Sequence, residues 1–359
     1  MIKPNHHAEM YELGKFRVRS QKDYNKWYNV NSTGNDLKCS CYDNKFRHSD
    51  CKHIHVIKTR IMKNSFSKKF KIMSRDDFKI CKFCDSDNIT KYGFKKTKSG
   101  NNQRFKCLEC NKIFTTNYGF ESMRYDGVII TSALQMYFSG MSVRKISDHF
   151  EMLGTGVSHV SIYKWICKYS KSISEYLTNI TPDYLLWFRA DEVWLNIKGK
   201  QNYLFASICD DTRFFIAKDI ADTKFQHNAD HLLEMTKQVA GNKNPKHFIT
   251  DRLLAYMKSS KKIFGKDTLH TRHIHLKGDK QNNKMERFNG SFRDREQAFR
   301  GLKKQVSSII DGYYIYYNFT RKHLALNGST PSESAGIVID GKNKWKILSQ
   351  NASLNQYDD

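Results

Sequence analysis

The order of strands and helices after Pro182 constrains the fold of this chain more than any other feature. Three apolar runs rich in β-branched and aromatic residues follow one another, divided by Lys-Gly-Lys and Asp-Asp-Thr turns: LLWFRADEVWLNIKG, QNYLFASICDD and TRFFIAKDIAD. A helical pattern, the short run HFITD, a second helix, the strand-like TLHTRHIH and a third helix come next. Because strands separated by helices can pair in parallel, we expect an α/β domain with a mixed sheet flanked by helices.

Three acidic residues fall at special points of that pattern. Asp191 lies inside the first strand, Asp251 ends the fourth strand, and Glu286 lies on the last helix. A carboxylate buried in a strand is costly unless a cation compensates it. A divalent metal is one candidate and the nearby Arg189 is the other. Turn or surface positions account better for the remaining acids of the region, namely Glu192, Asp210, Asp211 and Asp219.

The helix that carries Glu286 also allows a purely structural interpretation. Asn283 followed by Glu286 matches a capping box, in which the glutamate bonds back to the start of the helix. A helix that begins at Asn282 or Asn283 has one apolar face, formed by Met285, Phe288, Phe292 and Phe299. An adjacent face is one acid followed mainly by cations: Glu286, Gly290, Arg293, Gln297 and Arg300.

Together these motifs resemble the DDE transposases of bacterial and archaeal insertion sequences, which have a ribonuclease H-like integrase core. The matching segments are ADEVWLNIKG with Asp191, YLFASICDDTRF, ITD with Asp251 and NNKMERFNGSFRDREQAFRG with Glu286. The segment YYNFTRKHLALNGSTPSESAG is similar to the YNxxRxHxxLxxxTPxE tail of that family. The resemblance covers residues 186–337. It implies that the three acids hold two Mg²⁺ (or Mn²⁺) ions that serve DNA cleavage and strand transfer.

Histidines and basic residues near these acids are candidates for supporting roles. Four histidines could assist proton transfer or contact phosphate, although histidines near strands are more often structural: His270, His273, His275 and His323. The cations that follow Glu286 are predicted to contact DNA phosphates, with a solvated helix face as the alternative: Arg287, Arg293, Arg295, Arg300, Lys303 and Lys304.

Two cysteine pairs upstream predict a zinc ribbon. Cys81-x-x-Cys84 and Cys107-x-x-Cys110 are separated by 22 residues, and two strand-like pieces around a Ser-Gly-Asn-Asn turn lie between them. Four thiolates fill the tetrahedral coordination of a structural Zn²⁺ and leave no open position for catalysis. The basic and aromatic strands between the pairs suit contact with DNA phosphates.

A second cysteine cluster lies nearer the amino terminus. Three thiolates and one imidazole form the pattern CxC…CxH, which resembles the SWIM zinc finger and suits a second structural Zn²⁺: Cys39, Cys41, Cys51 and His53. Reduced core cysteines beside an ordinary histidine are the alternative, and His48 and His55 are substitute ligands. Two short runs before the cluster, FRVRS and KWYNV, predict a hairpin. The basic segment after it is read as a linker or a phosphate-contacting arm.

Residues 126–173 have a helical period and predict three helices joined by short glycine-containing turns. Ser142 and either Ser158 or Ser161 are the expected N-caps. The layout fits a helix-turn-helix whose last helix presents four residues to a DNA major groove: Ser158, His159, Ser161 and Lys164. A three-helix bundle that does not bind DNA is the alternative.

The charge of the chain favours a nucleic acid as partner. The sequence has 61 Lys and Arg against 36 Asp and Glu, a net charge of +25 and a pI near 9.6. An anionic membrane is the rival partner, but no run of 18 apolar residues occurs. The amino terminus lacks the zones of a secretory signal. We therefore expect a soluble, nucleoid-associated cytoplasmic protein of a prokaryote, whose nine cysteines do not form disulfides.

The sequence thus predicts a multidomain insertion-sequence transposase, at least dimeric on DNA, that binds its terminal repeats, cuts them and joins them to target DNA. Two alternatives remain open: a nonenzymatic regulatory protein derived from a transposase, and a ribonuclease H or resolvase-like nuclease. Five segments are expected: a SWIM-like finger at 1–60, the zinc ribbon at 76–120, the helix-turn-helix at 125–178, the catalytic core at 183–340 and a tail at 341–359.

Overall fold

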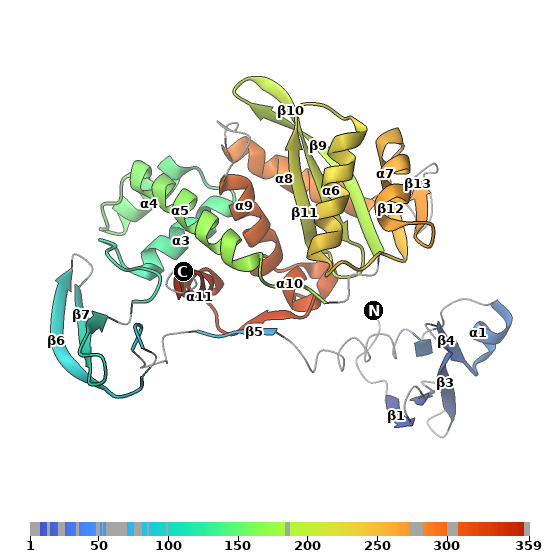
Figure 1. The fold of residues 1–359 in the computed structure, drawn as a ribbon, viewed down its shortest axis with the longest axis horizontal. Helices are drawn as coiled ribbons and strands as arrows, with labels where there is room; N and C mark the ends of the chain where they lie inside the picture. Colours follow the sequence, from blue (N-terminus) through green and yellow to red (C-terminus); the bar gives the residue numbers. More distant parts are fainter. Residues whose placement is uncertain are drawn as a thin grey trace. The chain divides into compact units, whose positions relative to one another are not determined.

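The computed structural model comprises two compact units, residues 1–69 and 70–359, and each is described by itself (Figure 1). The structure describes residues 8–12, 15–20, 26–33, 36–47, 51, 53–54, 70–74, 81–84, 86–97, 100–115, 117–183, 187–272, 283–299 and 308–354.

The first unit is a small antiparallel sheet beside a cysteine cluster. Its four strands pair in chain order, and a short helix follows: β1 (Ala8–Glu12), β2 (Lys15–Arg19), β3 (Trp27–Thr33), β4 (Asp36–Cys39) and α1 (Tyr42–Arg47). The antiparallel pairing of β2 with β3 confirms the predicted hairpin. Val18 and Val30 point from these two strands into a core shared with the cysteines.

The second unit begins with β5 (Phe70–Ile72), which pairs in parallel with β14 (Ile337–Ile339) near the end of the chain. A three-stranded antiparallel sheet follows: β6 (Ile89–Thr97), β7 (Gly100–Cys107) and β8 (Ile113–Thr115). Phe105 and Phe114 are buried against the cysteines at its base. The two strand-like pieces of the predicted ribbon are therefore present as an antiparallel pair.

Three helices come next, as predicted: α3 (Gly127–Phe138), α4 (Val143–Met152) and α5 (His159–Leu177). The predicted serine caps are confirmed, because Ser142 and Ser158 accept backbone N–H bonds at the starts of α4 and α5. Helix α5 packs against α9 (Ser308–Ile315) and α11 (Lys344–Leu354). The segment predicted as a tail therefore contains a packed helix, whose Trp345 donates a hydrogen bond to Gln135 of α3 at 2.9 Å.

The five-stranded sheet at the centre has the order β11-β10-β9-β12-β13. Strand β10 is antiparallel to both β9 and β11, whereas β12 is parallel to both β9 and β13. This confirms the predicted mixed sheet, and helices flank it. The elements are β9 (Trp187–Ile197), β10 (Lys200–Cys209), β11 (Phe215–Ala221), α6 (Gln226–Val239), β12 (His247–Thr250), α7 (Leu254–Phe264), β13 (Leu269–Arg272) and α8 (Asn283–Phe299).

Helix α6 packs on β10 and β11, and α8 packs on β9 (Figure 1). Met285, Phe288 and Phe292 are at most 1% exposed, so the predicted apolar face of α8 is confirmed at these positions. The side chain of Phe299 lies outside the described residues. Because burying an apolar side chain contributes about 1.5–3 kcal/mol, these three residues hold α8 firmly on the sheet.

The tail signature folds back onto the sheet through a π-helix (Tyr316–Thr320), a 3-10 turn (Leu324–Leu326) and α10 (Pro331–Ser334). The buried amide of Asn318 accepts from the backbone N–H of Phe215 and donates to its carbonyl, both at 2.8 Å. Thr330 and Glu333 form a capping box at the start of α10. Asn318 therefore fastens the signature to the edge strand β11, and the capping box stabilises the start of α10.

Candidate catalytic site

Strand pairing brings the first two predicted acids together. The last paired residues of the parallel strands β9 and β12 are Ala190 and Thr250. Asp191 and Asp251 each follow directly, so they emerge side by side where β12 ends and the edge of β9 becomes free. The N–H of Leu253 donates to Asp251 Oδ1 at 2.9 Å and orients this carboxylate.

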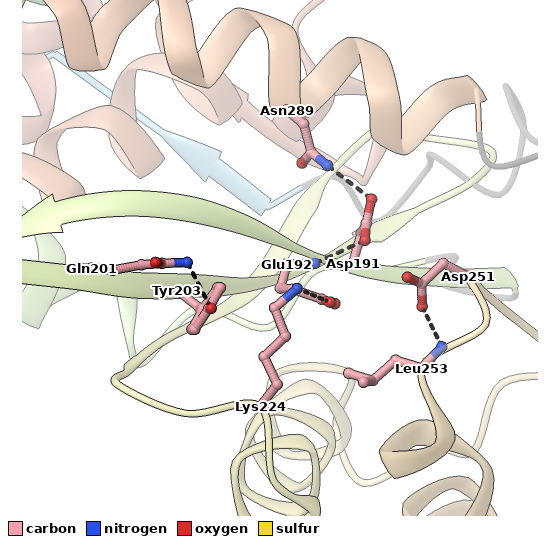
Figure 2. A network of polar contacts seen from close by, with 8 residues as sticks. All are labelled: Asp191, Glu192, Gln201, Tyr203, Lys224, Asp251, Leu253 and Asn289. Carbon is pink, nitrogen blue, oxygen red and sulfur yellow. Dashed lines mark hydrogen bonds and ion pairs between the residues drawn. The ribbon is translucent and has the colours of Figure 1, made fainter.

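A third carboxylate completes the group, and it is not the one expected. Oxygen atoms of Asp191, Glu192 and Asp251 lie within 4.8 Å of one another (Figure 2). The prediction that Glu192 occupies a turn or surface position is wrong, since it lies in β9 and its side chain is 4% exposed. Its Oε1 forms an ion pair with Lys224 Nζ at 2.7 Å. Burial raises the pKa of Glu192, and Lys224 opposes that shift.

Asp191 is the most strongly perturbed of the three. Burial, followed by the charges of Glu192 and Asp251, raises the pKa of Asp191 to about 7. Asn289 Nδ2 on α8 donates to Asp191 Oδ2 at 2.8 Å, and the N–H of Glu192 donates to Oδ1 at 2.9 Å (Figure 2). Two donors thus fix this carboxylate, but no described cation contacts it.

The alternative in which Arg189 compensates Asp191 is wrong, because the fully buried Arg189 forms its ion pair with Asp210. Lys284, in the first turn of α8, contacts the other oxygen of Asp210 at 2.5 Å. Although burial acts in the opposite direction, these two cations hold the pKa of Asp210 below its usual range. This network ties α8 to the end of β10.

Two further acids had been predicted at turns or on the surface. Asp211 is exposed in the turn after β10, as expected. Asp219 instead lies within β11, where its Oδ2 contacts His231 Nδ1 at 2.9 Å. Its neighbourhood therefore differs from that of the three clustered acids.

The structure does not bring Glu286 into the carboxylate group. Glu286 is exposed in the first turn of α8, three residues before Asn289. Residues three apart on a helix are neighbours on its surface, so Glu286 lies one turn from the amide that contacts Asp191. Among the described residues, Glu286 has no hydrogen-bond partner, which gives no support to the capping-box interpretation. Asn289 is not predicted from the sequence, and its position three residues after Glu286 is the signal that could have indicated it.

Most of the predicted supporting residues near the site have structural partners or lie exposed. His270 hydrogen-bonds Thr250 Oγ1 at 2.9 Å, and His323 packs edge-on against Tyr317. Burial lowers the pKa of each histidine to about 4, so both are neutral at physiological pH. Arg295 donates to the backbone carbonyl of Ser139, whereas Arg287 and Arg293 are exposed on α8. The other candidates lie outside the described residues: His273, His275, Arg300, Lys303 and Lys304.

The ribbon cysteines are arranged as metal ligands. Ligand atoms of all four lie within 4.8 Å of one another, with sulfur–sulfur distances of 3.5 Å for Cys81–Cys110 and 3.6 Å for Cys84–Cys107. Such spacing suits Zn–S bonds of about 2.3 Å. The N–H of Cys110 lies 3.5 Å from the sulfur of Cys107, and such bonds lower the pKa of the Cys107 thiol to about 7. Backbone donors that favour a thiolate fit a zinc knuckle.

The amino-terminal cluster is also assembled. Cys39, Cys41, Cys51 and His53 are buried with ligand atoms within 4.8 Å of one another. His53 Nδ1 faces the sulfurs of Cys39 at 3.7 Å and Cys51 at 3.8 Å, while Tyr28 stacks on the ring at 4.3 Å. The set fits Zn²⁺ bound through Nδ1. The alternative ligands His48 and His55 lie outside the described residues.

The candidate DNA-reading residues cluster at the start of α5. His159 and Lys164 are exposed there. Ser158 Oγ accepts from the N–H of Ser161 at 3.2 Å, and the two hydroxyl oxygens are 3.0 Å apart. Both serines therefore stabilise the helix start, and His159 and Lys164 are the freer side chains.

Parts of the chain are similar to a known domain family and to known transposases. Residues 186–323 match the family model of the DDE domain. The chain is similar to the transposase for insertion sequence element IS257 in transposon Tn4003 from Staphylococcus aureus, at 23% identity over 227 residues, 62% of this chain and 99% of the relative. The transposase for insertion sequence-like element IS431mec from the same species has the same identity and coverage.

Two solved structures each resemble part of the chain. The HTLV-2 integrase catalytic core domain in complex with magnesium has 11% sequence identity and a TM-score of 0.32, covering 44% of this chain and 99% of that one. The catalytic core domain of BIV integrase has 13% identity and a TM-score of 0.32, covering 42% and 94%. Separately, the described helices include none that is long and apolar enough to cross a membrane.

Proposed function

We propose that this chain, an insertion-sequence transposase with a DDE domain at residues 186–323, binds the ends of its own element and uses Asp191, Asp251 and Glu286 to cut and join DNA. The observation that carries the proposal is the group of carboxylates within 4.8 Å at the free edge of β9, inside the matched domain. Close carboxylates with little cationic compensation are typical of sites for divalent metals.

The residues present fit Mg²⁺ or Mn²⁺. Carboxylate and amide oxygens are the hard ligands these ions prefer. Among the described residues, the buried Glu192 Oε2 and Asn289 Oδ1 have no hydrogen-bond partner, and such oxygens are costly to bury without one. A bound divalent ion would supply Lewis acidity toward the phosphate and a more acidic water. Asp191 and Asp251 would hold it.

The reaction to be served has two steps of the same kind. In cleavage, a water oxygen bonds to phosphorus while the bond to the 3′-oxygen breaks, and that oxygen receives a proton. In strand transfer, the freed 3′-hydroxyl attacks a target phosphodiester, loses its proton and displaces the 3′-oxygen of the target strand. The chain orients Asp191 through Asn289 and Asp251 through the N–H of Leu253, so the charges that must face the phosphate are fixed in advance.

Glu286 is proposed as the third acid because α8 is docked directly on the site. Lys284 fixes the first turn of this helix to Asp210, and Asn289 fixes its next turn to Asp191. Glu286 lies between these anchors and is exposed. A rotation about its own side-chain bonds would redirect its carboxylate while these two anchors hold the helix in place.

The segments before the core are proposed to bind DNA. The two cysteine clusters would each hold one structural Zn²⁺, through Cys39, Cys41, Cys51 and His53 in the first and the four ribbon cysteines in the second. His159 and Lys164 at the exposed start of α5 support major-groove reading. Arg287 and Arg293 would contact phosphates beside the acids, with Arg300 further along. Two element ends must be processed together, which supports at least a homodimer.

The proposal is tested with purified protein and a labelled duplex taken from the DNA that borders the coding region. We expect Mg²⁺- or Mn²⁺-dependent nicking and joined products, and we expect Asp251→Asn to abolish both while binding persists. Asp267→Asn, which changes an exposed aspartate elsewhere in the same domain, serves as the matched control. Sequence-specific binding without any cleavage would assign the chain to the regulatory alternative. Preferred cleavage of branched DNA or RNA–DNA hybrids would assign it to the nuclease alternative.

A further inference from the structure

We propose that the zinc ribbon and the helix-turn-helix form one continuous surface for the phosphate backbone of duplex DNA, with Arg124 at its centre. The inference rests on the proposed function, because it names the part of the chain that holds the element end beside the recognition helix. It assigns a role to residues 117–125, which join the ribbon to the first helix of the helix-turn-helix.

Two neighbouring grooves define the surface. A groove of about 650 Å³ lies between the ribbon strands and the joining segment, and its lining includes Lys95, Arg104 and Arg124. A second groove of about 420 Å³ is lined by Arg124 together with Ser158 and Ser161 at the start of α5. Both grooves share Ser122, Met123 and Arg124. The joining segment therefore links the ribbon to the recognition helix along one track.

The charge of this track suits a polyanion. Lys95 and Arg124 are exposed and Arg104 is half-buried, and in the described part of the chain none of the three forms an ion pair with a carboxylate. Among the residues that the structure describes, Glu121 is the one acid that lines the larger groove. Duplex DNA carries one negative charge per about 1.7 Å of its axis, so a row of uncompensated cations matches its backbone.

The joining segment is fastened to the recognition helix and cannot drift away from it. Tyr125 Oη donates to the carbonyl of Gly156 at 2.6 Å, and its ring packs edge-on against Trp165 at 5.3 Å. Tyr169 Oη, further along α5, donates to the carbonyl of Gly119 at 3.1 Å. Because Arg124 lies between these anchors, its position relative to the start of α5 is fixed.

The ribbon presents Lys95 and Arg104 on the face that lines the larger groove. Lys95 pairs across the strands with Asn102, and both line the larger groove with Arg104 two residues further on β7. Successive strand residues point to opposite faces, so Lys96, which pairs with Asn101, belongs to the other face. The ribbon therefore supplies a matched control: the same charge on the same strand, directed away from the track.

The decisive experiment compares Lys95→Ala/Arg124→Ala with Lys96→Ala/Lys266→Ala, which removes the same charge from exposed positions off the track. Binding of the full chain to the duplex that borders the coding region, and to a scrambled duplex, is measured over a range of salt concentrations. We expect the first variant to bind both duplexes more weakly. We also expect the plot of log Kobs against log salt to become less steep, its slope falling in magnitude by about 2, which is about 1 per lost phosphate contact. The control retains the wild-type slope.

Several outcomes would overturn the inference. Equal slopes for the two variants would place the DNA backbone elsewhere, and weakening confined to the bordering sequence would indicate base reading instead of phosphate contact. A slope change on double-stranded RNA but not on DNA would assign the track to RNA. Unchanged zinc content and thermal midpoint exclude a folding defect as the cause. Failure of the proposed function is recognised separately: the wild-type protein would then bind the bordering duplex no more tightly than the scrambled one.

Discussion

Replacing Asp251 by asparagine is expected to stabilise the metal-free protein while removing its response to metal. The substitution removes one of three negative charges whose oxygens lie within 4.8 Å of one another. It keeps an oxygen that can still accept the hydrogen bond from the N–H of Leu253. The local fold is therefore retained, and the change acts through charge.

The size of the effect follows from the geometry. Two unit charges 4.8 Å apart repel by about 3.5 kcal/mol at an effective dielectric constant of about 20. The ion pair between Glu192 and Lys224 already offsets part of this repulsion. Asp251 ranks behind burial and Glu192 among the causes of the raised pKa of Asp191. We therefore expect a gain of about 1 kcal/mol, or roughly 2–4 °C in thermal midpoint.

Thermal unfolding with EDTA and with Mg²⁺ or Mn²⁺, above pH about 7, provides the assay. The thermal midpoint of the wild-type protein should rise with metal concentration, because a ligand that binds only the folded state stabilises that state. In EDTA, Asp251→Asn should have a higher thermal midpoint than the wild type, and added metal should raise that midpoint little. Asp267→Asn should match the wild type under both conditions. A lower metal-free midpoint for Asp251→Asn, or an undiminished metal response, would refute the reasoning that these acids form a metal site.

Three further predictions follow from other parts of the structure. Arg189→Leu leaves Asp210 with a buried charge and with Lys284 as its one remaining ion-pair partner among the described residues. The free energy of unfolding in urea should therefore fall by about 3–5 kcal/mol, and an unchanged midpoint would contradict this. Cys107→Ser should lower the zinc content by one ion per chain and Cys167→Ser should not, as atomic absorption can show. Folding raises the pKa of Asp191 from 3.8 to about 7. The contribution of Asp191 to the stability of the metal-free protein is therefore full below pH about 4 and is lost as the pH rises to about 7. Thermal unfolding in EDTA across that pH range measures this loss.

The metal-ligand patterns were readable from the sequence because their geometry is local. The ribbon cysteines occur in pairs within single turns, so their spacing almost fixes how they can meet around one ion. The same holds for the cap of α5, where Ser158 precedes a helical apolar period. The position of Asp251 was also predictable, because a short apolar strand that ends in an acid places that acid at the edge of the sheet.

The partners of the acids were not readable in this way. Arg189 lies two residues from Asp191 in the sequence, yet it pairs with Asp210 of the turn after β10. The strand register places Arg189 opposite Ile208, two residues before Asp210, and this register belongs to the tertiary structure. Asn289 contacts Asp191 because α8 packs on the sheet in one particular position. That position is set jointly by three buried apolar side chains of α8 and by Lys284. Such contacts join residues far apart in the chain.

By itself, the sequence determined the order of strands and helices, both cysteine clusters, and the positions of Asp191 inside one strand and Asp251 at the end of another, since each depends on local periodicity or spacing. Only the tertiary structure decided which carboxylates meet. Strand β12 ends at Thr250 and leaves the edge of β9 free, so Glu192 joins Asp191 and Asp251, while Glu286 lies exposed on α8. The length of β12 determines where the edge of β9 becomes free, and the sequence of β9 alone does not contain this information.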